Sequence, residues 1–198
     1  MKERPILFNG AMVRALLDGS KTQTRRVFKA KNGAVWPHKN DLPGMRQILR
    51  NCPYGQPGDR LWVREAWRTF KSYDALPPRD LLETCTIWRE ADATPRIDRS
   101  PLCGKLRPSM FMPRWASRIT LEIVSVRVER LQDISEADAS GEGLRFNSNC
   151  IGPWSFDGGQ QWLAAREAYR ELWNSINGPG SWAANPWVWV VEFKRLAA

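Results

Sequence analysis

The chain of 198 residues contains a single histidine, His38, and this limits the chemistry that it can perform. His38 lies in a stretch that is rich in proline and asparagine. Catalytic triads and acid–base pairs usually recruit a well-positioned imidazole, and this stretch offers little to hold one. We therefore expect any hydrolytic chemistry to depend on Lys, Thr, Ser, Glu, Asp or Cys side chains.

The four cysteines also argue against metal chemistry. They stand at irregular intervals, with no C-x-x-C pair among them: Cys52, Cys85, Cys103 and Cys150. A structural zinc site usually needs clustered thiolates and imidazoles. We expect no metal and no other cofactor, and we expect the four residues to be free thiols that pack as small apolar side chains.

The charge of the chain favours a polyanionic partner. There are 30 Lys and Arg residues against 21 Asp and Glu residues, which gives a formal net charge of +9 and a sequence pI near 9.8. Such an excess favours RNA, DNA or nucleotides as partners, although it also fits a soluble basic protein with no such partner. The apolar content is 42%, with 11 Trp, which suffices for the core of one domain.

Neither end of the sequence suggests an address outside the cytoplasm. The apolar run near the N-terminus is too short for a signal peptide, and no stretch approaches the roughly 20 apolar residues that span a bilayer. We expect a cytoplasmic protein that does not contact a membrane and that is a monomer or a weak homodimer.

A tight corner is predicted between the first helix and the second strand. Residues 5–8 suit a short strand, and residues 11–17 suit a helix that begins after Asn9 and is closed by Gly19. Residues 22–27 can then be extended, since Thr and Val suit strands. Lys21 therefore lies in the corner, followed by a stretch over residues 28–58 that is typical of a loop because of its prolines and glycines.

Further strands are expected at 60–67, 84–90, 119–131 and 187–193, with helices at 135–141 and 160–176 and a helical turn at 114–117. The apolar register in the strand 119–131 slips by one between Ile123 and Val124, which predicts a β-bulge. Short strands with few helices predict a mainly β, α+β fold, a small closed or nearly closed barrel with peripheral helices. We expect one domain over 1–198, with insertions at about 28–57, 71–104 and 144–160.

Four segments, in this order, resemble motifs of the ASCH domain family in the PUA-like superfamily. They are residues 17–26 (LDGSKTQTRR), 58–67 (GDRLWVREAW), 134–143 (ISEADASGEG) and 185–193 (NPWVWVVEF). These segments are most similar to those of prophage-encoded and phage-encoded members. The resemblance covers nearly the whole chain outside the insertions, and it implies a PUA-like β-barrel.

The resemblance implies a protein that handles RNA or modified nucleobases. One bacterial ASCH branch is an amidohydrolase that removes acetyl from N4-acetylcytidine with Lys, Thr and Glu, which match Lys21, Thr24 and Glu142 here. That branch is smaller and lacks the Trp-rich insertions. Other members are nucleases or nucleic-acid binders, so a non-catalytic RNA- or DNA-binding module, a nuclease and a phage accessory protein remain alternatives.

The matched residues have chemical roles consistent with amide hydrolysis. The Thr24 hydroxyl becomes a nucleophile only when a base removes its proton. Lys21 can be that base if burial and the neighbouring cations Arg25 and Arg26 lower its pKa, and Glu142 can orient Lys21 or pass a proton to the leaving amine. Because Lys21 and Thr24 are three residues apart, the corner must bend for them to converge. The alternative is that Lys21 and Thr24 are merely solvated.

Four further residues are candidates for contacts with the substrate or nucleic acid: Arg25, Arg26, Arg64 and Glu65. A guanidinium matches the oxygens of a phosphate in two parallel hydrogen bonds, which makes Arg26 and Arg64 suited to phosphate or base contacts. The alternative is that they form internal pairs with carboxylates such as Glu65.

Overall fold

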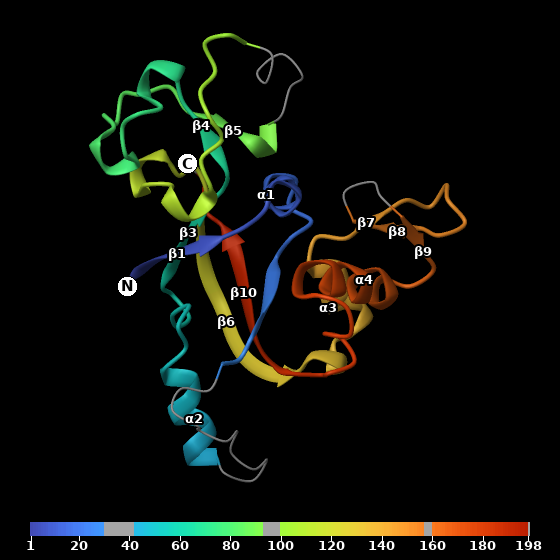
Figure 1. The fold of residues 1–198 in the computed structure, drawn as a ribbon. Helices are drawn as coiled ribbons and strands as arrows, with labels where there is room; N and C mark the ends of the chain where they lie inside the picture. Colours follow the sequence, from blue (N-terminus) through green and yellow to red (C-terminus); the bar gives the residue numbers. More distant parts are fainter. Residues whose placement is uncertain (30–41, 93–99, 157–159, 198) are drawn as a thin grey trace.

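A curved five-stranded sheet forms the centre of the molecule (Figure 1). The computed structural model describes residues 1–29, 42–92, 100–156 and 160–197. The strands follow the order β1 (Glu3–Leu7), β3 (Arg60–Arg64), β6 (Thr120–Arg130), β10 (Trp187–Arg195) and β2 (Gln23–Val27). Only β1 and β3 pair in parallel, and the other three pairings in this sheet are antiparallel.

The fold class is α+β, but the closed barrel that the sequence predicts is not confirmed. Among the described strands, β1 and β2 are the two edges of the sheet and do not pair with each other. A side chain joins them instead, because Arg26 Nη2 donates a hydrogen bond to the carbonyl oxygen of Leu7 at 2.6 Å.

The predicted β-bulge is present where the apolar register slips. Along β10, Glu192 is opposite Ser125 and the next residue, Phe193, is opposite Ile123. Val124 therefore has no partner, so Ile123 can stay 1% exposed while Val124 is 53% exposed. Such an extra residue increases the bend of a long strand, consistent with the curvature of β6 in Figure 1.

Helices cover the two faces of β10. Val191 and Phe193 pack in one apolar cluster with residues of helix α1 (Gly10–Leu17). Val188 and Val190, which point the opposite way, pack in a second cluster with helix α4 (Ala165–Asn177) and helix α3 (Glu136–Gly141). The sheet thus carries apolar material on both faces, and α3 and α4 lie together on one of them (Figure 1).

The predicted starts of two helices are confirmed. The Asn9 side chain accepts a hydrogen bond from the Met12 amide at 2.9 Å at the start of α1. Ser135 Oγ accepts one from the Asp138 amide at 3.1 Å at the start of α3. Gly19 follows α1 with φ of +83°, a conformation in which glycine avoids the steric cost of a Cβ atom.

Some sequence-based predictions of elements were wrong. Part of the predicted loop 28–58 is helix α2 (Leu42–Arg50), because Pro43 falls in the first turn, where a helix needs no donor from it. The predicted strand 60–67 is broken after β3, and its last residue begins β4 (Trp67–Arg68), which pairs with β5 (Trp88–Arg89) in a separate sheet.

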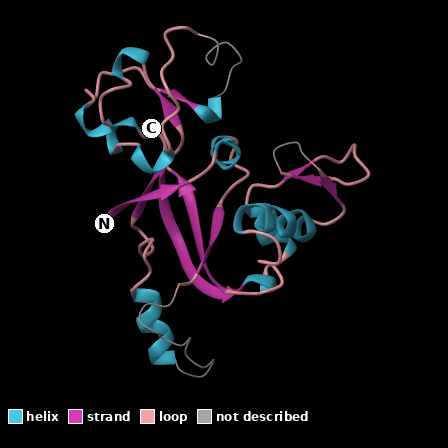
Figure 2. Cartoon of the chain, viewed as in Figure 1, coloured by secondary structure: helices cyan, strands magenta, loops and turns pink. Residues whose placement is uncertain are grey.

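The predicted loop 144–160 and the helix start at 160 also differ. A small sheet occupies this region, with β7 (Arg145–Phe146), β8 (Trp154–Ser155) and β9 (Gln161–Trp162). Short 3-10 helices complete the fold (Figure 2): η1 (Lys71–Tyr73), η2 (Pro78–Asp80), η3 (Glu90–Asp92), η4 (Ser109–Phe111), η5 (Arg114–Ala116) and η6 (Leu131–Asp133).

Two properties of the described residues concern membranes and metals. No helix among them is both long and apolar enough to cross a bilayer. No group of three or more His, Cys, Asp and Glu residues in the same ranges is arranged to hold a metal ion. His38, the histidine of the sequence, lies outside the described residues.

Candidate active site

The corner after α1 places Lys21 beside Glu142. The Lys21 amide donates to the carbonyl of Ala15 at 2.9 Å, which folds the chain back onto the end of the helix. Lys21 then forms an isolated antiparallel bridge with Glu142, and the Thr22 amide donates to the carbonyl of Gly141 at 2.8 Å. The bend that the sequence requires at this point is therefore present.

Glu142 accepts hydrogen bonds from two buried cations. Lys21 Nζ donates to Glu142 Oε2 at 2.8 Å and to the Glu142 carbonyl oxygen at 2.9 Å. Arg25 Nη1 donates to Glu142 Oε1 at 3.2 Å. The side chains of Lys21 and Arg25 are 0% exposed and that of Glu142 is 3% exposed. Charges are buried at high cost unless they are paired, so these three groups depend on one another.

Two glycines let the chain come close on either side of Glu142. A Cβ atom on Gly141 would lie 2.8 Å from Gln23 Nε2, and one on Gly143 would lie 2.9 Å from Ala15 Cβ and 3.2 Å from Lys21 Cβ. Gly143 also has φ of +99°. The Gly-Glu-Gly sequence therefore serves to seat the carboxylate against the corner.

We expect Gly143→Ala to destabilise the fold more than Gly178→Ala does. Gly178 has nearly the same φ, +97°, but a Cβ atom at this position would meet no atom within 4 Å. Both substitutions carry the backbone cost of about 1–2 kcal/mol, and Gly143→Ala adds a clash that typically costs about 1–3 kcal/mol more. Urea unfolding of both variants measures the difference, and equal losses would contradict the close approach.

Arg25 extends the ionic network toward the sheet. Its Nε and Nη2 donate to Glu129 Oε1 at 3.1 and 2.6 Å, and Nη2 lies 3.3 Å from Asp138 Oδ2. Arg127 pairs with the same two carboxylates, at 3.1 Å each, and also with Glu192. The guanidinium of Arg25 is thus held in a fixed orientation by three carboxylates from two segments.

A small cavity opens beside this network. It has a volume of about 70 Å³ and is lined by Thr24, Arg25, Glu142 and Tyr169, with apolar residues of α4. Lys21 does not line it, because its ammonium lies behind Glu142, 5.5 Å from the centre of the Phe8 ring. The cavity therefore presents a hydroxyl, a carboxylate, a guanidinium and a phenol to any group that enters.

Burial tunes two protonation equilibria at this site. Burial lowers the pKa of Lys21 below its ordinary value of 10.5, the Glu142 carboxylate opposes this shift, and the Arg26 and Arg25 guanidinium groups add to it. Burial raises the pKa of Tyr169 well above 10, and the nearby negative charge of Glu142 raises it further. A lysine with a lowered pKa in a polar cavity wall is suited to act as a base.

The lowered pKa of Lys21 predicts a pH effect on stability. Between the folded-state pKa and 10.5 the unfolded chain binds more protons than the folded one, so this residue makes the fold more stable as the pH rises through that window. The difference in unfolding free energy between the wild type and Lys21→Met should therefore shift in favour of the wild type toward pH 10.5. A difference that is constant with pH would contradict the shift.

The sequence-predicted residues are brought together only in part. Lys21, Thr24, Glu142 and Arg25 meet at the cavity or directly behind it, although Arg25 is fully paired rather than free to bind phosphate. Arg26 lines the same cavity, with its guanidinium 5.3 Å from the centre of the Phe8 ring.

Arg64 and Glu65 lie away from the cavity. Arg64 Nη1 donates to the Met110 carbonyl at 3.0 Å, and its guanidinium lies 4.5 Å from the centre of the Trp62 ring. Glu65 is 1% exposed and takes two hydrogen bonds from Arg118, at 3.0 and 3.1 Å. Burial raises the pKa of Glu65, against the opposing effect of Arg118. A pair between Arg64 and Glu65 is not formed, since Arg118 and Arg89 take the carboxylate.

Sequence reasoning missed three participants: Glu129, Asp138 and Tyr169. Asp138 was expected only to help begin a helix, and Tyr169 only to fill the apolar stripe of another. A buried tyrosine hydroxyl usually needs a polar partner, which is a signal that Tyr169 faces a polar site. Glu129, in a strand of otherwise apolar alternation, carries the signal that a charge on a packed strand needs a cation nearby.

Comparisons with known proteins add little to this geometry. No family model matches the chain, and no curated protein does. A similar solved structure is the ASCH domain from Lactobacillus crispatus JV V101, with 12% identity, coverage of 98% of this chain and 79% of that chain, and a TM-score of 0.42. A similarity at this TM-score assigns neither a family nor a site to this chain.

Proposed function

We propose that the chain is an ASCH-type protein directed at nucleosides or nucleic acid, and that the Lys21 site hydrolyses the amide of an acylated cytosine. The observation that carries the proposal is the buried Lys21–Glu142 ion pair behind a cavity that Thr24 lines. A buried ion pair gives little net stability, and titratable groups with shifted pKa values beside a cavity are candidates for catalysis. The supporting pattern is the match of these residues to the ASCH amidohydrolase motif.

The residues suggest the following sequence of proton transfers. A proton passes from Lys21 to Glu142 across their 2.8 Å hydrogen bond, leaving a neutral amine and a neutral carboxylic acid. Lys21 then accepts the proton of the Thr24 hydroxyl as the oxygen attacks the acyl carbon. The carbon–nitrogen bond breaks, and Glu142 gives its proton to the leaving amine. Water hydrolyses the resulting ester, which releases the carboxylic acid and restores Thr24.

The size of the cavity restricts what enters it. Typical ligand pockets measure about 300–1,000 Å³, whereas this one measures about 70 Å³. A short acyl group and its amide suit this volume, while the ring and sugar of a nucleoside must lie outside or move α4 residues aside. The Arg25 guanidinium and the Tyr169 hydroxyl are the donors available to the oxygen of the amide as it gains negative charge.

Acetate release tests this function. The wild-type protein is incubated with free N4-acetylcytidine and with a single-stranded RNA that contains it, and the products are separated by chromatography. We expect acetate and unmodified cytidine from at least one of the two substrates. If neither is hydrolysed, with the protein shown to be folded, the amidohydrolase proposal is wrong.

A non-catalytic nucleic-acid-binding module is the second candidate. The net charge of +9 favours it, because a free nucleoside carries no phosphate to attract. The closed pairing of Arg25 also favours it, since a network whose members satisfy one another is what a purely structural role requires. Binding of RNA together with no turnover of either acetylated substrate would select this candidate.

A further inference from the structure

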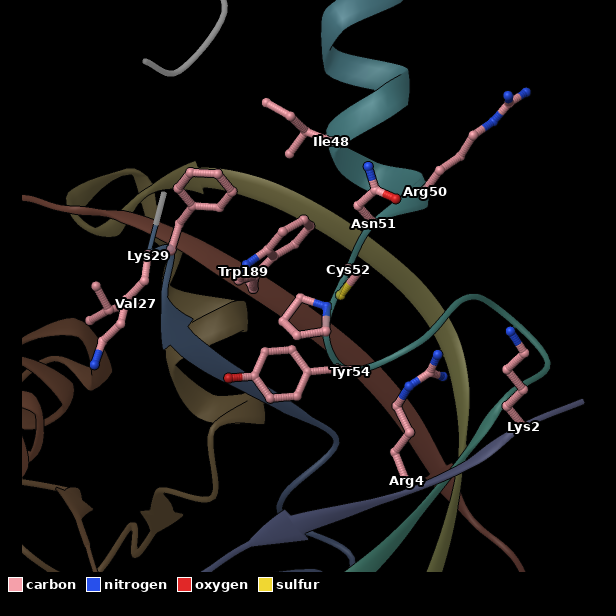
Figure 3. A pocket seen from close by; sticks show the side chains of 12 residues that line it. Lys2, Arg4, Val27, Lys29, Ile48, Arg50, Asn51, Cys52, Tyr54 and Trp189 are labelled. Atoms are coloured by element: carbon pink, nitrogen blue, oxygen red, sulfur yellow. The ribbon is translucent and has the colours of Figure 1, made fainter. Parts of the chain in front are cut away.

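A second and much larger groove lies between the sheet and α2. Its volume is about 980 Å³, and its walls come from β1, the end of β2, β10 and residues 48–54 (Figure 3). The small cavity and this groove share one wall residue, Val27 of β2. The groove is large enough for a nucleotide, while the cavity is not.

Aromatic rings occupy the middle of the groove. Figure 3 shows the Tyr54 ring and the Trp189 indole close to each other at its centre. Trp189 is 4% exposed and packs against Phe28, with ring centres 5.3 Å apart, so it forms a fixed floor. Tyr54 is half-buried, and burial raises the pKa of its hydroxyl, which keeps the ring neutral. Such rings offer a flat apolar surface on which a base can stack.

Cations surround these rings. The charged residues that line the groove are Lys2, Arg4, Lys29 and Arg50, and among its described lining residues there is no Asp or Glu. Figure 3 places Lys29 on one side of the rings and Lys2 and Arg4 on the other. Arg4 pairs with Asp59 at 3.2 Å, whereas Lys29 and Arg50 are exposed and form no ion pair with a described residue.

We infer that this groove binds single-stranded nucleic acid, with a base stacked at Tyr54 and phosphates held by Lys29 and Arg50. Cations on either side of aromatic rings match a polymer that alternates phosphates and bases, and unpaired bases are needed because a duplex hides their faces. The inference adds a strand-binding site to the proposed function and does not depend on catalysis. The shared wall at Val27 would put a bound strand next to the small cavity.

Fluorescence anisotropy with a labelled single-stranded oligouridylate tests the groove, with a duplex of the same length as a second probe. We expect tighter binding of the single strand. The double variant Lys29→Glu/Arg50→Glu should weaken it at least about ten-fold and reduce the slope of log affinity against log salt by about 2, near one unit for each lost phosphate contact. Tyr54→Ala should weaken it about ten-fold, the loss typical of removing a stacking ring, whereas Tyr54→Phe should retain it.

Lys71→Glu/Arg79→Glu is the matched control for charge. Both residues are exposed and follow β4, which lies at the opposite end of the sheet from α2 (Figure 1). Wild-type affinity in the groove variants, or an equal loss in the control, would overturn the inference. Unchanged RNA binding by the groove variants, with free N4-acetylcytidine hydrolysed, would reject the groove alone. Weakened binding by those variants, with no hydrolysis by the wild type, would reject the amidohydrolase proposal alone.

Discussion

Glu142→Gln is expected to lower the free energy of unfolding by about 3–5 kcal/mol, the usual cost of removing one partner from a buried ion pair. Glu142 is the partner of both Lys21 and Arg25, and neither cation is exposed to water. The amide keeps the shape of the carboxylate, so the effect is electrostatic. The buried Lys21 can relieve part of the cost by losing its proton, and the loss should therefore be greater at lower pH.

Urea unfolding at pH 6 and pH 9 measures this prediction. Glu3→Gln is the matched control, because Glu3 pairs with Arg114 at 3.0 Å but is 36% exposed. Exposed pairs typically contribute less than about 1 kcal/mol. A loss at Glu142 no larger than the loss at Glu3 would show that the buried network is not held together by this carboxylate.

Lys21→Arg is expected to reduce the rate of deacylation by about 10²–10⁴-fold, the range typical of losing a general base. A guanidinium does not give up its proton at any accessible pH, although it can still pair with Glu142. The wild-type rate should rise with pH as Lys21, whose pKa burial lowers, loses its proton.

The measurement is the turnover number of both proteins across the pH range in which they stay folded, with acetylated RNA as substrate. The larger guanidinium also strains a packed site, so circular dichroism must show the variant folded at each pH. A Lys21→Arg protein as fast as the wild type, or with the same pH profile, would contradict a base at this position.

Local signals in the sequence predicted the elements that carry the site. The side chain of Asn9 begins α1 and Gly19 follows its end, and these two residues lead the chain into the corner at Lys21. The apolar slip at Ile123 and Val124 likewise predicted the bulge in β6. Each of these signals involves residues close together in the chain, where backbone preferences act directly.

The partners in the ionic network could not be predicted in this way. Arg25 and Glu129 are 104 residues apart, and Lys21 and Glu142 are 121 apart. Which carboxylate meets which cation depends on how strands from distant segments pair, and charged side chains alone do not specify it. The resemblance selected Glu142, but nothing local indicated that Arg25 is shielded and that Glu65 pairs with Arg118.

Helix α2 and the groove beside it were hidden for a different reason. Prolines and glycines over residues 28–58 favour a loop, and the proline that falls within α2 stands at a position where a helix tolerates it. Tyr54 and Trp189 come from segments that the sequence does not place together. The groove could be recognised only when the strand pairing had put β10 under residues 48–54.

The hydroxyl of Thr24 provides the most direct test of the proposed hydrolysis. Acetate release from acetylated RNA is measured for the wild type, Thr24→Ser and Thr24→Val, with Thr22→Val as a control at an exposed threonine of the same corner. We predict activity in the wild type and in Thr22→Val, reduced activity in Thr24→Ser, and none in Thr24→Val, because only the last lacks a nucleophile at the cavity. Undiminished acetate release by Thr24→Val would contradict the mechanism.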